Sequence, residues 1–226
     1  MNHAELPSEP HFRERPTAPI VPDAYALGAV PLLAAPVAAA LGWSWLAVAF
    51  GGLCVFVLAF FRNPDRALPA DPEAVVAPAD GRVLAVDEIE TRDGRKVLRI
   101  GIFLSVFNVH VNRAPVAGRV VAREPGGQRF LAAFNARGEQ ENVRLALDLD
   151  LADGRRVRVV QITGLIARRI VCHPQVGEWV ERGARYGLIR FGSRTDVWLP
   201  AEAVALVAVG DRVRGGATAI ARLGAR

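Results

Sequence analysis

The chain has 226 residues, which allows one domain of about 150 to 170 residues and a further segment. Its net charge of +5 is modest, and its basic residues are scattered rather than clustered with aromatic side chains, which argues against a nucleic-acid-binding protein. Its two cysteines, Cys54 and Cys172, argue against a disulfide framework and fit the cytoplasmic side of a membrane.

The chain begins with a polar arm and continues with a long apolar segment. Residues 1–22 contain five prolines and mixed charges, so a disordered arm is predicted. Residues 24–61 contain no charged side chain and are close to twice as long as the roughly 20 residues that cross a bilayer. This segment starts too late and is too long for a signal peptide. A membrane-associated helical hairpin is therefore predicted over residues 23–62, with a buried helical pair inside a soluble protein as the alternative.

Two apolar runs make up this segment. They are Ala24 to Leu41 and Trp43 to Phe61, and they meet at Gly42, which suits a tight turn between two helices. Pro31 and Pro36 weaken the first run as a regular helix, because proline lacks the amide hydrogen that a helix interior uses.

Arginines on both flanks of the apolar segment predict its orientation. Arg13 and Arg15 precede it, and Arg62 and Arg66 follow it, so the positive-inside rule places both ends in the cytoplasm. Arginines beside a membrane segment also suit anionic lipid headgroups. The protein is therefore predicted to lie at the cell membrane, on its cytoplasmic face.

Residues 63–226 change to short runs rich in β-forming residues. Asp93-Gly94 and Asp153-Gly154 are hairpin-turn signals between neighbouring runs. Short strands at this spacing favour an antiparallel sandwich or barrel over parallel strands alternating with helices. The predicted strands are residues 74–77, 81–89, 96–103, 109–113, 118–122, 145–151 and 156–163.

An internal repeat adds detail to this β-rich region. Residues 176–192, VGEWVERGARYGLIRFG, and residues 209–224, VGDRVRGGATAIARLG, follow the same pattern with one residue deleted. Such glycine-rich hairpins resemble those of lipoyl- and biotinyl-type β-sandwiches, and this likeness raises a rival function, a membrane-tethered adaptor or cofactor-carrying module. Carrier modules attach their cofactor to a lysine at a hairpin tip, and neither copy contains a lysine. Lys96 is the only lysine in the chain and lies outside the repeat.

Four sequence blocks carry a resemblance to a known family. They are FFRNPDR at 60–66, APADGRV at 77–83, FLSVFNVHVNRAP at 103–115 and RFGSRTDVWLP at 190–200. In this order they resemble the phosphatidylserine decarboxylase proenzymes of the short form. The resemblance implies a carboxy-lyase of phospholipid biosynthesis that converts phosphatidylserine to phosphatidylethanolamine and carbon dioxide at the membrane.

The resemblance also implies self-processing at the Gly192-Ser193 bond. Ser193 Oγ attacks the Gly192 carbonyl, and subsequent elimination leaves a chain of residues 1–192 and a chain of residues 193–226 that stay together as a heterodimer. Ser193 then becomes a pyruvoyl group, whose ketone takes the place of pyridoxal phosphate as the electron sink. The expected cofactor is therefore this covalent pyruvoyl group, with no pyridoxal phosphate and no metal.

Proton transfer in both phases calls for a group that titrates near neutrality. His110 lies in the block that bears the family's histidine and is the candidate. Longer relatives carry a second histidine three positions later, which pairs with serine and aspartate for self-cleavage, and Arg113 stands there in this chain. Either His110 serves both phases or another base drives cleavage, with His173 as the remaining candidate in a structured run.

Two aspartates complete the set of candidates. Asp80 corresponds to the family's aspartate and is predicted to orient a histidine and to stabilise its protonated form, although Asp-Gly at the start of a strand is also a turn signal. Asp196 is predicted to be a strand residue that faces solvent.

Overall fold

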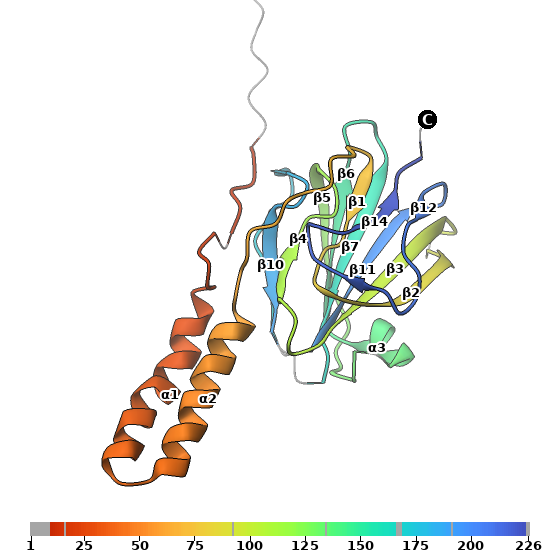
Figure 1. Ribbon diagram of the computed structural model, residues 1–226. Coiled ribbons are helices and arrows are strands. Elements are labelled where there is room, and N and C mark those ends of the chain that lie inside the picture. Colours follow the sequence, from red (N-terminus) through yellow and green to blue (C-terminus); the bar gives the residue numbers. More distant parts are fainter. Residues whose placement is uncertain are drawn as a thin grey trace, which may run out of the picture.

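The computed structural model describes residues 10–15, 17–91, 93–133, 135–165, 169–190 and 192–224. A pair of long helices projects from one end of a β domain (Figure 1). The fold is mainly β, as predicted, with one short further helix, α3 (Ala136–Glu141), beside the strands.

The helix pair occupies the segment predicted for it. Helix α1 (Asp23–Ala40) and helix α2 (Ser44–Phe60) run antiparallel, and the turn between them contains Gly42 at a φ of 75°. Helix α1 is continuous across both of its prolines. At 1.5 Å per residue each helix is about 27 Å long, close to the roughly 30 Å thickness of a bilayer's hydrocarbon core.

Most of the outer surface of the hairpin is apolar and exposed, so the helices are not buried inside the β domain. Side chains along both helices project into solvent, among them Val30, Leu33, Trp45 and Val48. By length and composition, α1 is long and apolar enough to cross a membrane, and α2 is a slightly shorter apolar helix.

The base of the hairpin packs against the β domain. Phe60 and Phe61 at the end of α2 form an apolar cluster with Val109, Val111 and Leu188 of the β domain. Burial of these aromatic rings fixes the hairpin at one end of the β domain.

Residues 10–15 of the arm predicted to be disordered lie along the β domain, whereas residues 1–9 and 16 lie outside the described residues. Backbone hydrogen bonds join Phe12 to Trp179 at 2.8 Å and Arg15 to Arg185 at 3.0 Å. The Arg185 guanidinium also bonds Glu14 and Asp65. Proline-rich composition does not prevent this packing, because the arm needs only a few hydrogen bonds to a strand that is already folded.

The strands form three antiparallel sheets. The largest has eight strands in the order β13-β2-β3-β11-β7-β6-β5-β9, and two three-stranded sheets have the orders β1-β14-β12 and β4-β10-β8. The eight-stranded sheet curls (Figure 1). Side chains on its inner face pack with those of the smaller sheets in one apolar core. The strands are β1 (Ala74–Val76), β2 (Gly81–Glu90), β3 (Lys96–Leu104), β4 (Val111–Arg113), β5 (Gly118–Gly126), β6 (Arg144–Asp150), β7 (Arg156–Ile162), β8 (Ile170–Cys172), β9 (Trp179–Val180), β10 (Arg185–Ile189), β11 (Ser193–Pro200), β12 (Val204–Ala205), β13 (Arg212–Val213) and β14 (Ala219–Arg222).

The internal repeat is visible in the backbone. The first copy contains β9 and β10, and the second contains β13 and β14, each a two-residue strand followed by a longer one. Matching glycines have matching conformations: φ is 96° at Gly177 and 102° at Gly210, and 81° at Gly183 and 76° at Gly216. Residues other than glycine rarely adopt these positive φ values, which explains why both copies have glycine at these positions.

Candidate active site

The Gly192-Ser193 bond lies where the chain leaves β10 and enters β11. Ser193 is the first residue of β11 and pairs with Leu104, the last residue of β3. Gly192 has a φ of 61°, in the left-handed region that other residues rarely adopt. Ser193 is fully buried, and its Oγ has no hydrogen-bond partner among the described residues. A buried hydroxyl without a partner costs about 1 to 3 kcal/mol, so folding alone does not favour serine over alanine here.

The carbonyl of this bond lies against another glycine. Gly164 follows β7, and a Cβ added there would lie 2.1 Å from the Gly192 carbonyl oxygen. Only glycine allows this approach. Sequence reasoning missed Gly164, because a glycine between a strand and a loop is usually just a turn residue.

Gly164→Ala is expected to slow cleavage by about tenfold, the effect of about 1.4 kcal/mol on a barrier, because the new methyl group displaces the carbonyl that is attacked. Cleavage can be followed on denaturing gels after synthesis of the uncut chain. Gly51→Ala is the control, because its added methyl group meets nothing within 4 Å. Equal cleavage rates in the two variants would remove Gly164 from the site.

His110 lies beside the same junction. The Ile189 amide, three residues before Gly192, donates to the His110 carbonyl at 3.4 Å. The imidazole is 2% exposed and stacks on Phe60 with ring centroids 4.0 Å apart. Its Nδ1 lies 2.9 Å from the Asn108 carbonyl oxygen, and its Nε2 is buried without a partner among the described residues. Since a carbonyl only accepts, Nδ1 carries the proton and Nε2 presents a lone pair.

The pKa of His110 is lowered to about 4, mainly by burial and also by the positive charge of Arg62, while the hydrogen bond to Asn108 opposes the shift. The imidazole is therefore neutral at physiological pH and can accept a proton, although its pKa lies below the near-neutral value predicted for the proton-transfer group. This is the protonation state that a general base requires.

The same shift predicts a pH-dependent stability. Between pH 6.5 and about 4 the unfolded chain binds a proton at His110 that the folded chain does not, so the free energy of unfolding falls as the pH falls through this window. The full loss is about 3 kcal/mol. Thermal unfolding of Ser193→Ala, which stays one chain, should show a larger drop from about pH 7 to about pH 5 than unfolding of Ser193→Ala/His110→Gln. Identical drops would show that His110 is not a buried neutral group.

A buried hydrogen bond links β7, which pairs with the strand of Ser193, to β4, which begins directly after His110. Gln161 of β7 donates to Asn112 of β4 at 2.7 Å, and Gln161 lies opposite Thr195 of β11. Ser193 is two residues before Thr195, and His110 is two residues before Asn112. Residues two apart on a strand share a face, so Ser193 lies on the face of β11 that carries Thr195, and the bridge connects this part of the sheet to the segment of His110.

Asp80 lies at this end too, but its contacts differ from those expected. Gly81 begins β2, the neighbour of β3 in the sheet, and Asp80 precedes it. The Asp80 carboxylate accepts from Arg66 at 3.0 Å and from the Gly215 amide at 2.8 Å. No hydrogen bond to His110 is found among the described residues, and His110 Nδ1 is occupied by Asn108.

Arg113 lies close enough to Asp80 for their charges to interact. Its guanidinium donates to the carbonyl oxygens of Gly183 and Pro64 at 3.1 and 2.7 Å. Burial is the main reason that the pKa of Arg113 falls to about 10. Position 113, where longer relatives carry their second histidine, therefore lies beside Asp80. In this chain Arg66 and Arg113 are the basic residues near that carboxylate.

The prediction that Asp196 faces solvent is wrong. Asp196 is 1% exposed, and Arg194 bonds both of its carboxylate oxygens at 2.6 and 2.9 Å. Burial raises the pKa of Asp196, and the Arg194 charge opposes this. Gly101 on the neighbouring strand leaves room for the pair, since a Cβ there would lie 2.7 Å from the guanidinium.

His173 is placed farther from the cleavage bond. Its amide donates to Tyr186 of β10, three residues before Ile189, where β10 ends. Its imidazole is partly buried, which lowers its pKa, and the charges of Arg15 and Arg123 add to the effect. His173 is thus beside the arm and not beside Ser193.

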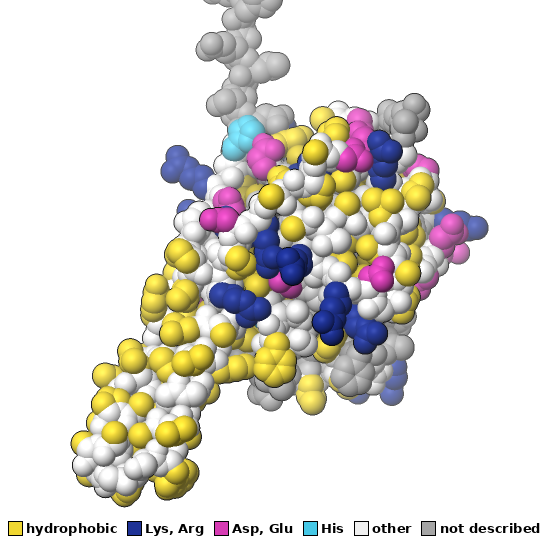
Figure 2. Space-filling view, viewed as in Figure 1, with side chains coloured by type: hydrophobic (Ala, Val, Ile, Leu, Met, Phe, Trp, Pro, Cys, Tyr) yellow, Lys and Arg dark blue, Asp and Glu magenta, His cyan; other side chains and the backbone are white. Residues whose placement is uncertain are grey.

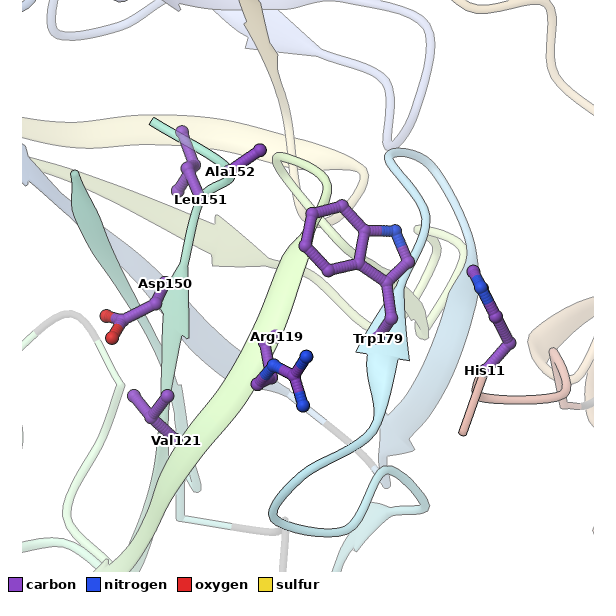
Figure 3. A pocket seen from close by; sticks show the side chains of 7 residues that line it. All are labelled: His11, Arg119, Val121, Asp150, Leu151, Ala152 and Trp179. Carbon is purple, nitrogen blue, oxygen red and sulfur yellow. The ribbon is translucent and has the colours of Figure 1, made fainter. Parts of the chain in front are cut away.

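The cavity shown in Figure 3 is not at this site. It has a volume of about 490 Å³ and opens beside Arg119 and Trp179. Arg119 pairs with Asp150 at one end of β6, whereas the other end, Arg144, pairs with Ile162 next to the cleavage bond. The cavity therefore lies at the opposite end of the sheet from Ser193.

Comparisons with known proteins identify the family. A family model described as phosphatidylserine decarboxylase matches residues 53–221. A phosphatidylserine decarboxylase proenzyme of Pelobacter propionicus is 52% identical over 77% of this chain and 80% of its own length. Proenzymes of Geotalea uraniireducens and Geobacter metallireducens are 46% and 45% identical, over 88% and 91% of this chain and 94% and 97% of their own lengths. The chain belongs to the phosphatidylserine decarboxylase family.

Proposed function

We propose that this protein is a self-processing, pyruvoyl-dependent carboxy-lyase that converts phosphatidylserine to phosphatidylethanolamine and carbon dioxide. The observation that carries the proposal is the Gly192-Ser193 junction, with its left-handed glycine and its buried, unpartnered hydroxyl. Family membership supports the substrate and the reaction. The adaptor alternative has no such support, because an adaptor does not need this junction.

Maturation starts when Ser193 Oγ attacks the Gly192 carbonyl carbon and the peptide bond becomes an ester. A base then removes the Cα proton of residue 193, and the Gly192 carboxylate leaves. The dehydroalanine at residue 193 tautomerises and takes up water, which releases ammonia and leaves a ketone. The products are residues 1–192 and residues 193–226, held together by the pairing of β11 with β3 and β7.

The residues present fit a pyruvoyl group at position 193. The small buried side chain lies at the start of a strand, and its Oγ has no described hydrogen bond that the conversion would break. When formed, the group supplies a ketone that withdraws electrons from the substrate's amino-acid portion. His110 supplies the proton transfers, because its free Nε2 is neutral at physiological pH.

Intact-mass measurement of the purified protein tests this function directly. Two fragments are expected: one that ends at Gly192, and one of about 34 residues with a blocked amino terminus. The smaller fragment should be lighter, by the mass of ammonia, than the same fragment with an amino-terminal serine. Release of carbon dioxide from carboxyl-labelled phosphatidylserine should accompany them. A single uncut chain with an intact Ser193 that nevertheless releases carbon dioxide would refute the proposed chemistry.

The hairpin is part of the proposal, as a membrane anchor with both ends on the cytoplasmic face. Its support is the exposed apolar surface of α1 and α2 and the flanking arginines. The lipoyl-type likeness of the β domain likewise stays a proposal, supported by the matching glycines of the two repeat copies.

Removal of the outer part of the hairpin tests the anchor. Replacing residues 27–55 by a short Gly-Ser linker keeps the base that packs on His110, so self-cleavage should persist while the protein moves from the membrane to the soluble fraction. Fractionation after carbonate washing gives the result. A shortened protein that still resists carbonate extraction would show that the hairpin is not the anchor.

A further inference from the structure

Two large apolar side chains are exposed at the end of the β domain that carries Ser193. Phe107 is 75% exposed in the turn after β3, and Leu165 is 66% exposed in the loop after β7. Strand β3 ends opposite Ser193, and β7 ends opposite Arg194. The two loops therefore flank the cleavage bond, one from each neighbouring strand.

The Phe107 turn is ordered, so the exposure of its ring is built into the fold. Asn108 Oδ1 accepts from the Ser105 amide at 2.9 Å and from the Ser105 hydroxyl at 2.8 Å. Arg62 donates to the Phe107 carbonyl at 2.8 Å and to the Ala59 carbonyl at 2.6 Å. The turn is thus tied to the end of α2, and folding alone does not require an aromatic ring at its tip.

The helical hairpin leaves the β domain at this same end. Phe60, the last residue of α2, stacks on His110, and in Figure 2 hydrophobic side chains cover the hairpin and continue along the adjoining border of the β domain. The apolar surface of the hairpin and the two loop tips therefore lie at the same end of the β domain.

The charge of this end favours an anionic lipid surface over a protein partner. Residues 103–113 and 163–174 contain no aspartate or glutamate. Two described arginines lie near the tips: Arg62 donates to the Phe107 carbonyl, and Arg169 is exposed in the segment that follows Leu165. Apolar tips next to arginines fit interfacial membrane binding, in which aromatic and aliphatic groups enter the headgroup region and the cations meet anionic lipids.

We infer that Phe107 and Leu165 are interfacial anchors that seat the Ser193 end of the β domain on an anionic phospholipid bilayer, separately from the helical hairpin. Seated in this way, the site meets the headgroup of a lipid that remains in the bilayer. The inference rests on the proposed function, since it assigns to this end the delivery of a lipid substrate.

The first test measures insertion of the Phe107 tip in the full-length protein. Phe107→Cys, in a Cys54→Ala/Cys172→Ala background, carries an environment-sensitive fluorophore, and Val204→Cys carries the same fluorophore at an exposed position beyond the other end of β11. With vesicles of phosphatidylglycerol and phosphatidylcholine, the label at 107 should shift to the blue and brighten, and the label at 204 should not. Vesicles of phosphatidylcholine alone should give a smaller change at 107.

The second test separates docking from chemistry. Phe107→Ser/Leu165→Ser should self-cleave normally and decarboxylate a short-chain, water-soluble phosphatidylserine at the normal rate, yet lose about tenfold in kcat/KM on phosphatidylserine in vesicles. Val176→Ser/Val204→Ser is the matched control, with two side chains that are each 59% exposed elsewhere on the domain. It should behave as the unaltered protein on both substrates.

Three results would overturn the inference while leaving the proposed function intact. The label at 107 could show no blue shift with vesicles, or the two double variants could have equal activity on vesicles. The third result is a homodimer of the unaltered protein that dissociates in Phe107→Ser/Leu165→Ser. The last would assign the tips to a second copy of the chain. Failure of the proposed function would look different, because cleavage and short-chain activity would then be absent in the unaltered protein.

Discussion

Ser193→Ala is expected to leave the chain uncut and without decarboxylase activity. Alanine has no oxygen to attack the Gly192 carbonyl, so neither the ester nor the ketone can form. The fold should survive, because Ser193 Oγ has no partner to lose among the described residues, and removal of an unpaired buried hydroxyl relieves its desolvation cost. The variant should therefore unfold at a temperature no lower than that of an uncut precursor.

Thr195→Ala is the matched control for this variant. Thr195 lies two residues along the same strand face, is equally buried, and also has a hydroxyl without a partner among the described residues. It should be cleaved at close to the normal rate. Intact mass and carbon dioxide release measure both variants, and cleavage of Ser193→Ala at the same bond would exclude Ser193 as the nucleophile.

The strands and their turns could be predicted because their signals are local. Asp93-Gly94 and Asp153-Gly154 do stand between β2 and β3 and between β6 and β7, with both glycines at positive φ. The alternation of apolar and polar residues identifies a strand without knowledge of the strands that it pairs with, because one face of each strand is buried. The apolar helices were predictable for the same reason.

Features that depend on partners far along the chain could not be predicted in this way. Asp196 is buried because Arg194 neutralises it and Gly101 leaves space, and only the two-residue spacing of Arg194 and Asp196 on one strand face hinted at such a pair. The stacking of Phe60 on His110 joins residues 50 positions apart, and no local pattern announces it. Local propensity therefore located the elements, while tertiary packing determined the surroundings of the site.

His110→Ala is expected to lower the rate of decarboxylation by on the order of a hundredfold, the usual size of a general acid-base contribution. The physical reason lies in the His110 ring: Nδ1 is bonded to the Asn108 carbonyl, so Nε2 is the ring nitrogen that can exchange protons. His110→Gln preserves more of the stacking on Phe60 and should show a similar loss. His173→Ala is the control and should retain near-normal turnover, because His173 lies beside the arm.

Arg113→His in the His110→Ala background separates the two models of self-cleavage. If His110→Ala also stays uncut, a histidine at 113 would lie beside Asp80 and recreate the pair that longer relatives use, so cleavage should recover while decarboxylation remains low. The substitution also removes the bonds of Arg113 to Gly183 and Pro64, so the thermal midpoint of the single variant Arg113→His must be measured alongside. If the single variant folds and the double variant still fails to cleave, then Asp80 cannot activate a base for Ser193 in this chain. Cleavage must in that case depend on His110 itself, with one neutral imidazole serving both the maturation of the chain and its turnover of lipid.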